Sequence, residues 1–141
     1  AGVRTWATVA ILADAGSDRP NELIVTSVVR GRFCELAGTA AGLGAGAHDL
    51  SLLGLFSMID AIVGRPLEPT LEAVCLPADV AAGILGEPGQ MADLLSLARA
   101  YERAEWSTVE TLAERLGLPL SAVPQIYLDA VEWGNRTHSM G

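Results

Sequence analysis

The stretch Leu-Ser-Leu-Leu-Gly-Leu-Phe-Ser-Met-Ile-Asp-Ala-Ile-Val, residues 50–63, decides the fold class of this chain. Its apolar side chains are so frequent that a helix formed by it is apolar nearly all round. A helix of that kind lies in the centre of a core rather than on a surface. Asp49 is placed to cap its first turn, and Gly64-Arg65-Pro66 ends it. The sequence therefore predicts a buried central helix.

Helical patterns continue on both sides of this stretch, without the sustained alternation that indicates strands. Ser107 and Glu110 form a capping box, and Ser121 is the expected cap of the last helix. Gly117 and Gly134 are expected to end the last two helices. A connector of small residues is expected at 38–47. The predicted helices are at 6–13, 20–37, 67–74, 78–85, 90–103, 107–116 and 121–134, so we expect an all-α helical bundle, one domain over residues 1–141.

Composition excludes several classes of protein. Half of the 141 residues are hydrophobic, so intrinsic disorder is excluded. The net charge is −8, and every basic residue is an arginine. Nucleic acid and anionic membrane are therefore not expected as partners, and a P-loop is excluded because it needs a lysine. No signal peptide or membrane-spanning stretch is evident, which predicts a cytoplasmic protein.

The residues that most often carry chemistry are sparse. Cys34 and Cys75 are expected to be buried thiols rather than a disulfide. The dipeptide His48-Asp49 resembles half of a metal site, but His138 is the only other histidine, so we interpret it as the start of a helix. The segment 42–47 matches a dinucleotide-binding glycine pattern, but no strand precedes it, and we interpret it as a connector.

Acidic and aromatic residues also favour structural roles. We expect two carboxylate pairs to lie on solvated helix faces: Glu102 with Glu105, and Asp129 with Glu132. We expect the tryptophans to be anchors in the core or in an interface: Trp6, Trp106 and Trp133. Asp60 is unusual because it interrupts an apolar helix. It is expected to meet an arginine, a helix N-terminus or a hydroxyl, with ligand binding as the alternative.

Residues 50–66 also resemble the signature G-L-F-S-x-x-D-A-x-x-G-x-P of the HDOD family, the HD-related output domains that follow EAL domains in bacterial cyclic-di-GMP signalling proteins. Three further segments resemble the family in the same order: 4–7, 29–36 and 97–106. The resemblance implies a helical HD-related fold, of which the chain is the C-terminal portion, cut from a larger protein.

The resemblance has consequences for function. In an active HD enzyme a metal-binding His and Asp would stand at Ser57 and Met58, and neither residue present replaces them. It implies no catalytic, cofactor-binding or metal-binding residues, and a regulatory role through contact with the EAL domain of the same protein, either directly or in a homodimer.

Two alternatives remain open at the sequence level. One is a degenerate HD-type phosphohydrolase. The other is a helix-turn-helix regulator that uses residues 112–127 to bind DNA. Four acidic residues against one arginine over 107–134 oppose the second alternative.

Overall fold

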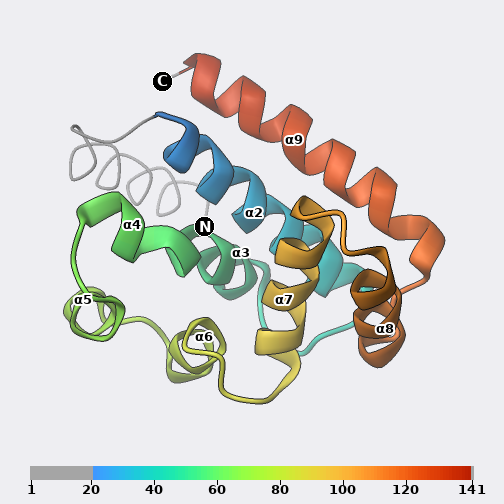
Figure 1. Ribbon diagram of the computed structural model, residues 1–141, viewed down its shortest axis with the longest axis horizontal. Helices are drawn as coiled ribbons and strands as arrows, with labels where there is room; N and C mark the ends of the chain where they lie inside the picture. Colours follow the sequence, from blue (N-terminus) through green and yellow to red (C-terminus); the bar gives the residue numbers. More distant parts are fainter. Residues whose placement is uncertain (1–20, 141) are drawn as a thin grey trace.

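The computed structural model describes residues 21–140 as a bundle of helices (Figure 1). Within this range no strand is present, so the predicted all-α fold is confirmed. No helix in the described range is long and apolar enough to cross a membrane. The helix expected at 6–13 lies outside the described residues. The helices are α2 (Asn21–Ala40), α3 (Ala47–Leu55), α4 (Ile59–Val63), α5 (Leu67–Val74), α6 (Ala78–Ile84), α7 (Gln90–Glu102), α8 (Trp106–Leu116) and α9 (Val123–Met140), with 3-10 turns η1 (Phe56–Met58) and η2 (Leu120–Ala122).

Helix α2 runs through the middle of the bundle, with α9 alongside it and α3 across it (Figure 1). Every residue from Leu50 to Leu55 is buried, so the prediction of a central apolar helix is confirmed for α3. The core joins α3 to α2 and α7 through large side chains that are completely inaccessible to solvent, among them Phe33, Leu53 and Leu94. Burial of each such side chain stabilises the fold by about 1.5–3 kcal/mol.

The expected single helix over 50–63 is divided in the structure. A 3-10 turn, η1, separates α3 from α4, and Met58 leaves helical geometry at φ −116° and ψ 14°. Gly64 then ends α4 in the left-handed conformation, as predicted. The predicted cap Asp49 is wrong, because α3 already begins after Gly46, whose backbone is extended.

Close approach of α2 and α3 depends on glycine. A Cβ atom on Gly54 would lie 2.4 Å from the carbonyl carbon of Arg30, and one on Gly31 would lie 2.9 Å from the carbonyl oxygen of Ser51. Gly38, expected to begin a connector, instead lies inside α2 against Leu50. These glycines allow the two backbones to touch.

The ends of α8 and α9 differ from the predicted ones. Helix α8 begins after Glu105 with no side-chain cap, so the capping box at Ser107 is wrong. Ser121 lies inside η2 rather than at a cap. Gly134 does not end α9, which continues to Met140. Glycine at this position instead leaves room for the side chain of Val29 on α2. Gly117 ends α8 with φ 74°, as predicted.

Candidate functional site

The buried arginine of α2 organises the polar part of the core. Arg30 is only 8% exposed, and its guanidinium binds both carboxylate oxygens of Glu102, on α7, at 2.5 and 3.0 Å. Its third contact is with the Ser57 hydroxyl of η1 at 3.0 Å. That hydroxyl donates in turn to the Gly54 carbonyl at 2.7 Å. The network ties three elements together, and bidentate pairing of this kind is strong and directional.

Beside this network lies an open groove of about 570 Å³ between α4 and the helices α7 and α8. Its volume is within the usual range for small-molecule sites. The groove is mostly polar, and its lining contains three arginines and two carboxylates together with a few apolar side chains. The residues that line it are Arg30, Ser57, Met58, Asp60, Ala61, Ser96, Arg99, Ala100, Arg103, Glu105 and Thr108. We call it the arginine groove.

Arg99 has an unfavourable electrostatic setting in this groove. Its guanidinium is half-buried, and partial burial together with the nearby charges of Arg30 and Arg103 lowers its pKa. Glu102 opposes this shift but is itself occupied by Arg30. Within residues 21–140, neither Arg99 nor Arg103 takes part in an ion pair.

The acidic side chains singled out in the sequence have different surroundings in the structure. Glu102 is half-buried and paired, so its assignment to a solvated face is wrong, whereas Glu105, Asp129 and Glu132 are exposed as expected. Asp60 is half-exposed in the first turn of α4, and no arginine contact is present for it in the described part of the chain. Its place in the first turn of α4 agrees with the helix N-terminus among the expected settings, and its side chain lines the arginine groove.

The pair at the position expected for metal ligands faces the same groove. Ser57 is buried, and its hydroxyl is engaged with Arg30 and Gly54. Met58 offers a thioether, a poor ligand for hard divalent cations. Among the described residues no group of three or more His, Cys, Asp or Glu side chains is arranged to hold a metal ion.

A series of aromatic rings runs from the core to the surface next to the arginine groove. The ring of Phe33, fully buried, meets Tyr127 edge-on at 5.9 Å, Tyr127 meets Tyr101 at 4.6 Å, and Tyr101 meets Trp106 at 5.2 Å. Trp106 is 58% exposed, so it is not a core anchor. Burial and the nearby Glu102 raise the pKa of Tyr127.

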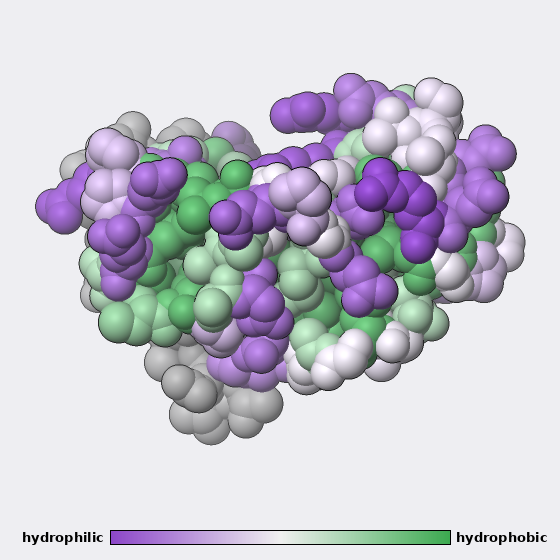
Figure 2. Space-filling model, turned by 90° about the horizontal axis from the view of Figure 1, so that it is seen from below, coloured by the Kyte–Doolittle hydropathy of each residue, from purple (hydrophilic) through white to green (hydrophobic). Residues whose placement is uncertain are grey.

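The other tryptophans have different settings. Trp133 is half-buried beneath the guanidinium of Arg32, whose carbon lies 5.3 Å from the ring centre. Trp6 lies outside the described residues. On the face seen in Figure 2, apolar side chains reach the surface in separate patches that hydrophilic residues divide. That view shows no single continuous apolar surface.

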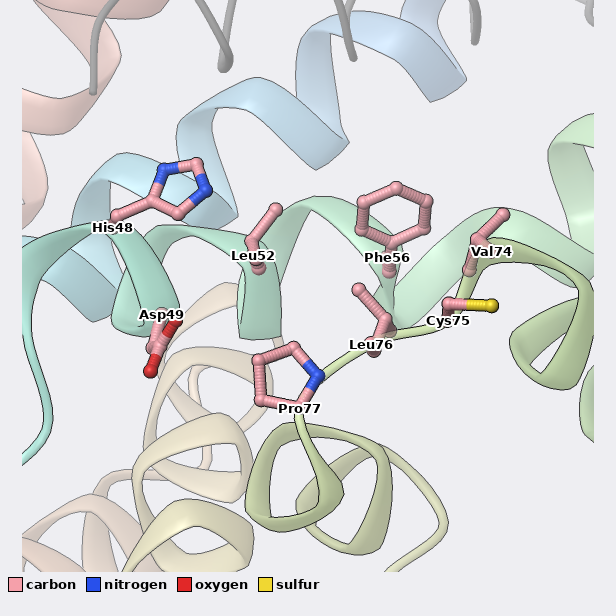
Figure 3. A pocket seen from close by; sticks show the side chains of 8 residues that line it. All are labelled: His48, Asp49, Leu52, Phe56, Val74, Cys75, Leu76 and Pro77. Carbon is pink, nitrogen blue, oxygen red and sulfur yellow. The ribbon is translucent and has the colours of Figure 1, made fainter.

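A second hollow, of about 340 Å³, contains the His48-Asp49 dipeptide (Figure 3). The two side chains point away from one another, so they do not form a joint ligand pair. Nδ1 of His48 is buried and has no hydrogen-bond partner within the described range. Leu52 and Phe56 continue the wall along α3 and η1, and Pro77 faces them from the connection to α6.

The cysteines divide into one buried and one exposed thiol. Cys34 is completely buried, as predicted, and this burial raises its pKa to about 12. Cys75 is exposed, which contradicts the expected burial, because it ends α5 in the left-handed conformation with φ 53°. The glycine pattern at 42–47 lies in the connection between α2 and α3, as predicted, and leads from a helix rather than a strand.

Comparison with known proteins gives two relatives. The chain is 30% identical over 131 residues to the cyclic di-GMP phosphodiesterase CdgJ of Vibrio cholerae, an alignment that covers 93% of this chain and 30% of CdgJ. It is 28% identical over 122 residues to the uncharacterized protein YuxH of Bacillus subtilis, covering 86% of the chain and 29% of YuxH. No protein-family model and no solved structure matches. The chain therefore corresponds to less than one third of either relative.

Proposed function

We propose that this chain is a non-catalytic regulatory domain of the HDOD type in bacterial cyclic-di-GMP signalling. It acts by contact with the EAL phosphodiesterase domain of the same protein, either directly or in a homodimer. The observation that carries the proposal is the similarity of nearly the whole chain to one segment of a protein named cyclic di-GMP phosphodiesterase. Most of that relative lies outside the aligned segment, which leaves room for a separate catalytic domain.

The polar network supports a role without catalysis. Where an HD enzyme would hold a cation, the Ser57 hydroxyl is bound by the guanidinium of Arg30. Because this hydroxyl accepts from Arg30 and donates to the Gly54 carbonyl, it is already engaged within the protein. In place of a metal ion, the Arg30–Glu102 pair thus links α2 to α7 at this point of the bundle.

Trp106 supports a role in contact. Its indole is exposed at the start of α8 and supported from below by Tyr101. Exposed tryptophans on a rigid base are typical anchors of protein interfaces. We assign the contact with the EAL domain to this end of the bundle.

The direct test is the phosphodiesterase rate of the EAL domain in the full-length gene product. We expect removal of this chain to change the rate, and Trp106→Ala to reproduce that change. Val74→Ala serves as the control, because Val74 is an exposed apolar side chain on a different helix, α5. A gene product without an EAL domain, or a rate that neither deletion nor Trp106→Ala alters, contradicts the proposal.

Two assays address the alternatives. CdgJ is named as an enzyme, so the chain should be assayed for phosphodiester hydrolysis with manganese or iron. Hydrolysis would favour the degenerate phosphohydrolase if a chelator abolishes it and the variant Glu102→Gln retains it. Salt-dependent binding of duplex DNA favours the helix-turn-helix regulator. We do not expect DNA binding, since α9 presents Asp129 and Glu132 to solvent. We do not expect hydrolysis, since Ser57 and Met58 are poor ligands for a divalent cation.

A further inference from the structure

The arginine groove contains two guanidinium groups that form no ion pair with another described residue. Arg99 lies in the last turn of α7 and Arg103 directly follows the end of that helix, and both line the groove together with Arg30. The charge of Arg30 is balanced by Glu102, whereas Arg99 and Arg103 have no ion-pair partner within residues 21–140. The positive charges of Arg99 and Arg103 repel one another, and the partial burial of Arg99 strengthens this repulsion. An anion bound between the two guanidinium groups would relieve it.

The groups around these arginines are suited to a phosphate. Planar guanidinium groups bind phosphate oxygens through two parallel hydrogen bonds. The hydroxyl side chains of Ser96 and Thr108 also line the groove and are exposed. Neither hydroxyl forms a hydrogen bond with another described residue, so both are available to a ligand.

The remaining lining excludes a simple inorganic anion as the best occupant. Asp60 and Glu105 contribute two carboxylates, which repel a bare anion but accept hydrogen bonds from N–H groups. Met58 and Ala61 provide apolar surface beside Asp60. A ligand that matches these groups carries a phosphate for the guanidinium groups and a flat ring with adjacent N–H donors for a carboxylate.

We propose that the arginine groove binds a guanine nucleotide, with the phosphate on Arg99 and Arg103 and the base edge on Asp60. Guanine is favoured over adenine because its edge offers adjacent ring and amino N–H donors to a carboxylate, whereas adenine offers only an amino group. The groove volume of about 570 Å³ accommodates a mononucleotide. This proposal does not rest on the proposed contact with an EAL domain, although the groove residues Glu105 and Thr108 flank Trp106 in the chain.

The test is calorimetric titration of the full 141-residue chain with GMP, AMP and inorganic phosphate. We expect saturable binding of GMP, with AMP and phosphate weaker by about tenfold or more, the value of one lost hydrogen bond to a charged group. Cyclic di-GMP is titrated in parallel because it carries the same two groups, and saturable binding of either guanine compound supports the site. Absence of saturable binding of both at millimolar concentration overturns it.

Variants locate the ligand. Arg99→Gln and Arg103→Gln should each weaken GMP by about tenfold or more, and Arg103 is exposed, so its variant avoids any cost of folding. Asp60→Asn should weaken the binding of GMP but not that of phosphate, because the variant removes a charge that repels a bare anion. Arg65→Gln, an exposed arginine outside the groove, is the matched control. AMP binding as tight as GMP, or full GMP affinity in the Arg103 variant, contradicts the assignment.

Discussion

Among single residues, Arg30 has the greatest consequence for stability because its charge is held away from water. A buried ion pair contributes little compared with apolar residues, but removal of one partner leaves the other charge uncompensated. Glu102→Ala should therefore reduce the free energy of unfolding by about 3 kcal/mol. Urea denaturation measures this loss, and the double variant Arg30→Met/Glu102→Leu should recover much of it.

The matched control is the Arg32–Glu35 pair on α2, whose partners are both about one third exposed. Glu35→Ala should cost less than about 1 kcal/mol, since exposed ion pairs contribute little. Equal losses in the Glu35 and Glu102 variants would show that burial of the Arg30 pair has no energetic importance.

The two thiols should differ in reactivity. Cys75 is exposed, so we expect it to react rapidly with an aromatic disulfide reagent at pH 8, whereas Cys34 should react only after unfolding. Because the pKa of Cys34 is raised from about 9.0 to about 12, the folded state keeps a proton that the unfolded state loses in this range. Stability should therefore fall as pH rises through 9 towards 12.

Thiol counts before and after denaturant check the first expectation. The pH dependence is checked by comparing urea midpoints of the chain and of Cys34→Ala, in which the alkaline loss should be smaller. Two reactive thiols in the native chain at pH 8 would contradict the burial of Cys34.

The sequence predicted a residue's role best where that role depends only on the local backbone. Gly64 and Gly117 end helices as predicted, because a left-handed residue is a local requirement. The partner of Glu102 could not be predicted, because Arg30 lies 72 residues away and only the fold brings them together. The place of Asp60 in the arginine groove could not be predicted either, because only the fold brings the lining residues together.

Among the helices, the crossing of α2 and α3 is the contact most sensitive to added volume. Gly54→Ala places a methyl group 2.4 Å from the backbone of Arg30, and backbone atoms cannot rotate away as a side chain does. We expect a loss of about 3 kcal/mol, in the upper part of the range for overpacked cores. Thermal denaturation followed by circular dichroism measures the change.

Gly44→Ala is the control for this substitution. No atom lies within 4 Å of a Cβ placed at Gly44, and its φ is not positive. Its effect should stay within about 0.5 kcal/mol. If the Gly54 variant were as stable as the Gly44 variant, the two helices would not be in the close contact described.

Helix contacts also explain why some element boundaries could not be predicted. Gly38 and Gly134 were interpreted as breaks because glycine often ends helices, but both lie inside helices that pass close to a neighbour. The η1 turn interrupts a stretch whose composition favours a continuous helix. Its buried Ser57 binds Arg30, a tertiary contact with no signal in the local pattern.

Across the whole molecule, the net charge of −8 should oppose folding at low ionic strength. The Debye length falls from about 30 Å at 0.01 M salt to about 8 Å at 0.15 M, which screens this repulsion. We expect the melting temperature to rise over this range, equally in sodium chloride and potassium chloride. A fall would mean that attractive surface pairs outweigh the net repulsion.

The class of fold follows from composition and periodicity, but the function does not. A helical bundle can be predicted because each helix has an apolar face that must be buried. Partners and ligands depend on which polar side chains the bundle brings to one surface. Arg99 and Asp60 stand on different helices and come to line the same groove only after folding.

The edge-on contact between Tyr101 and Trp106 gives the protein a built-in optical reporter. Indole emission depends on solvent, and Trp106 is well exposed, whereas Trp133 is half covered. A collisional quencher such as acrylamide therefore reaches the indole of Trp106 more readily than that of Trp133. A decrease in the quenching of Trp106 would therefore report the binding of a partner at this end of the bundle without an attached dye.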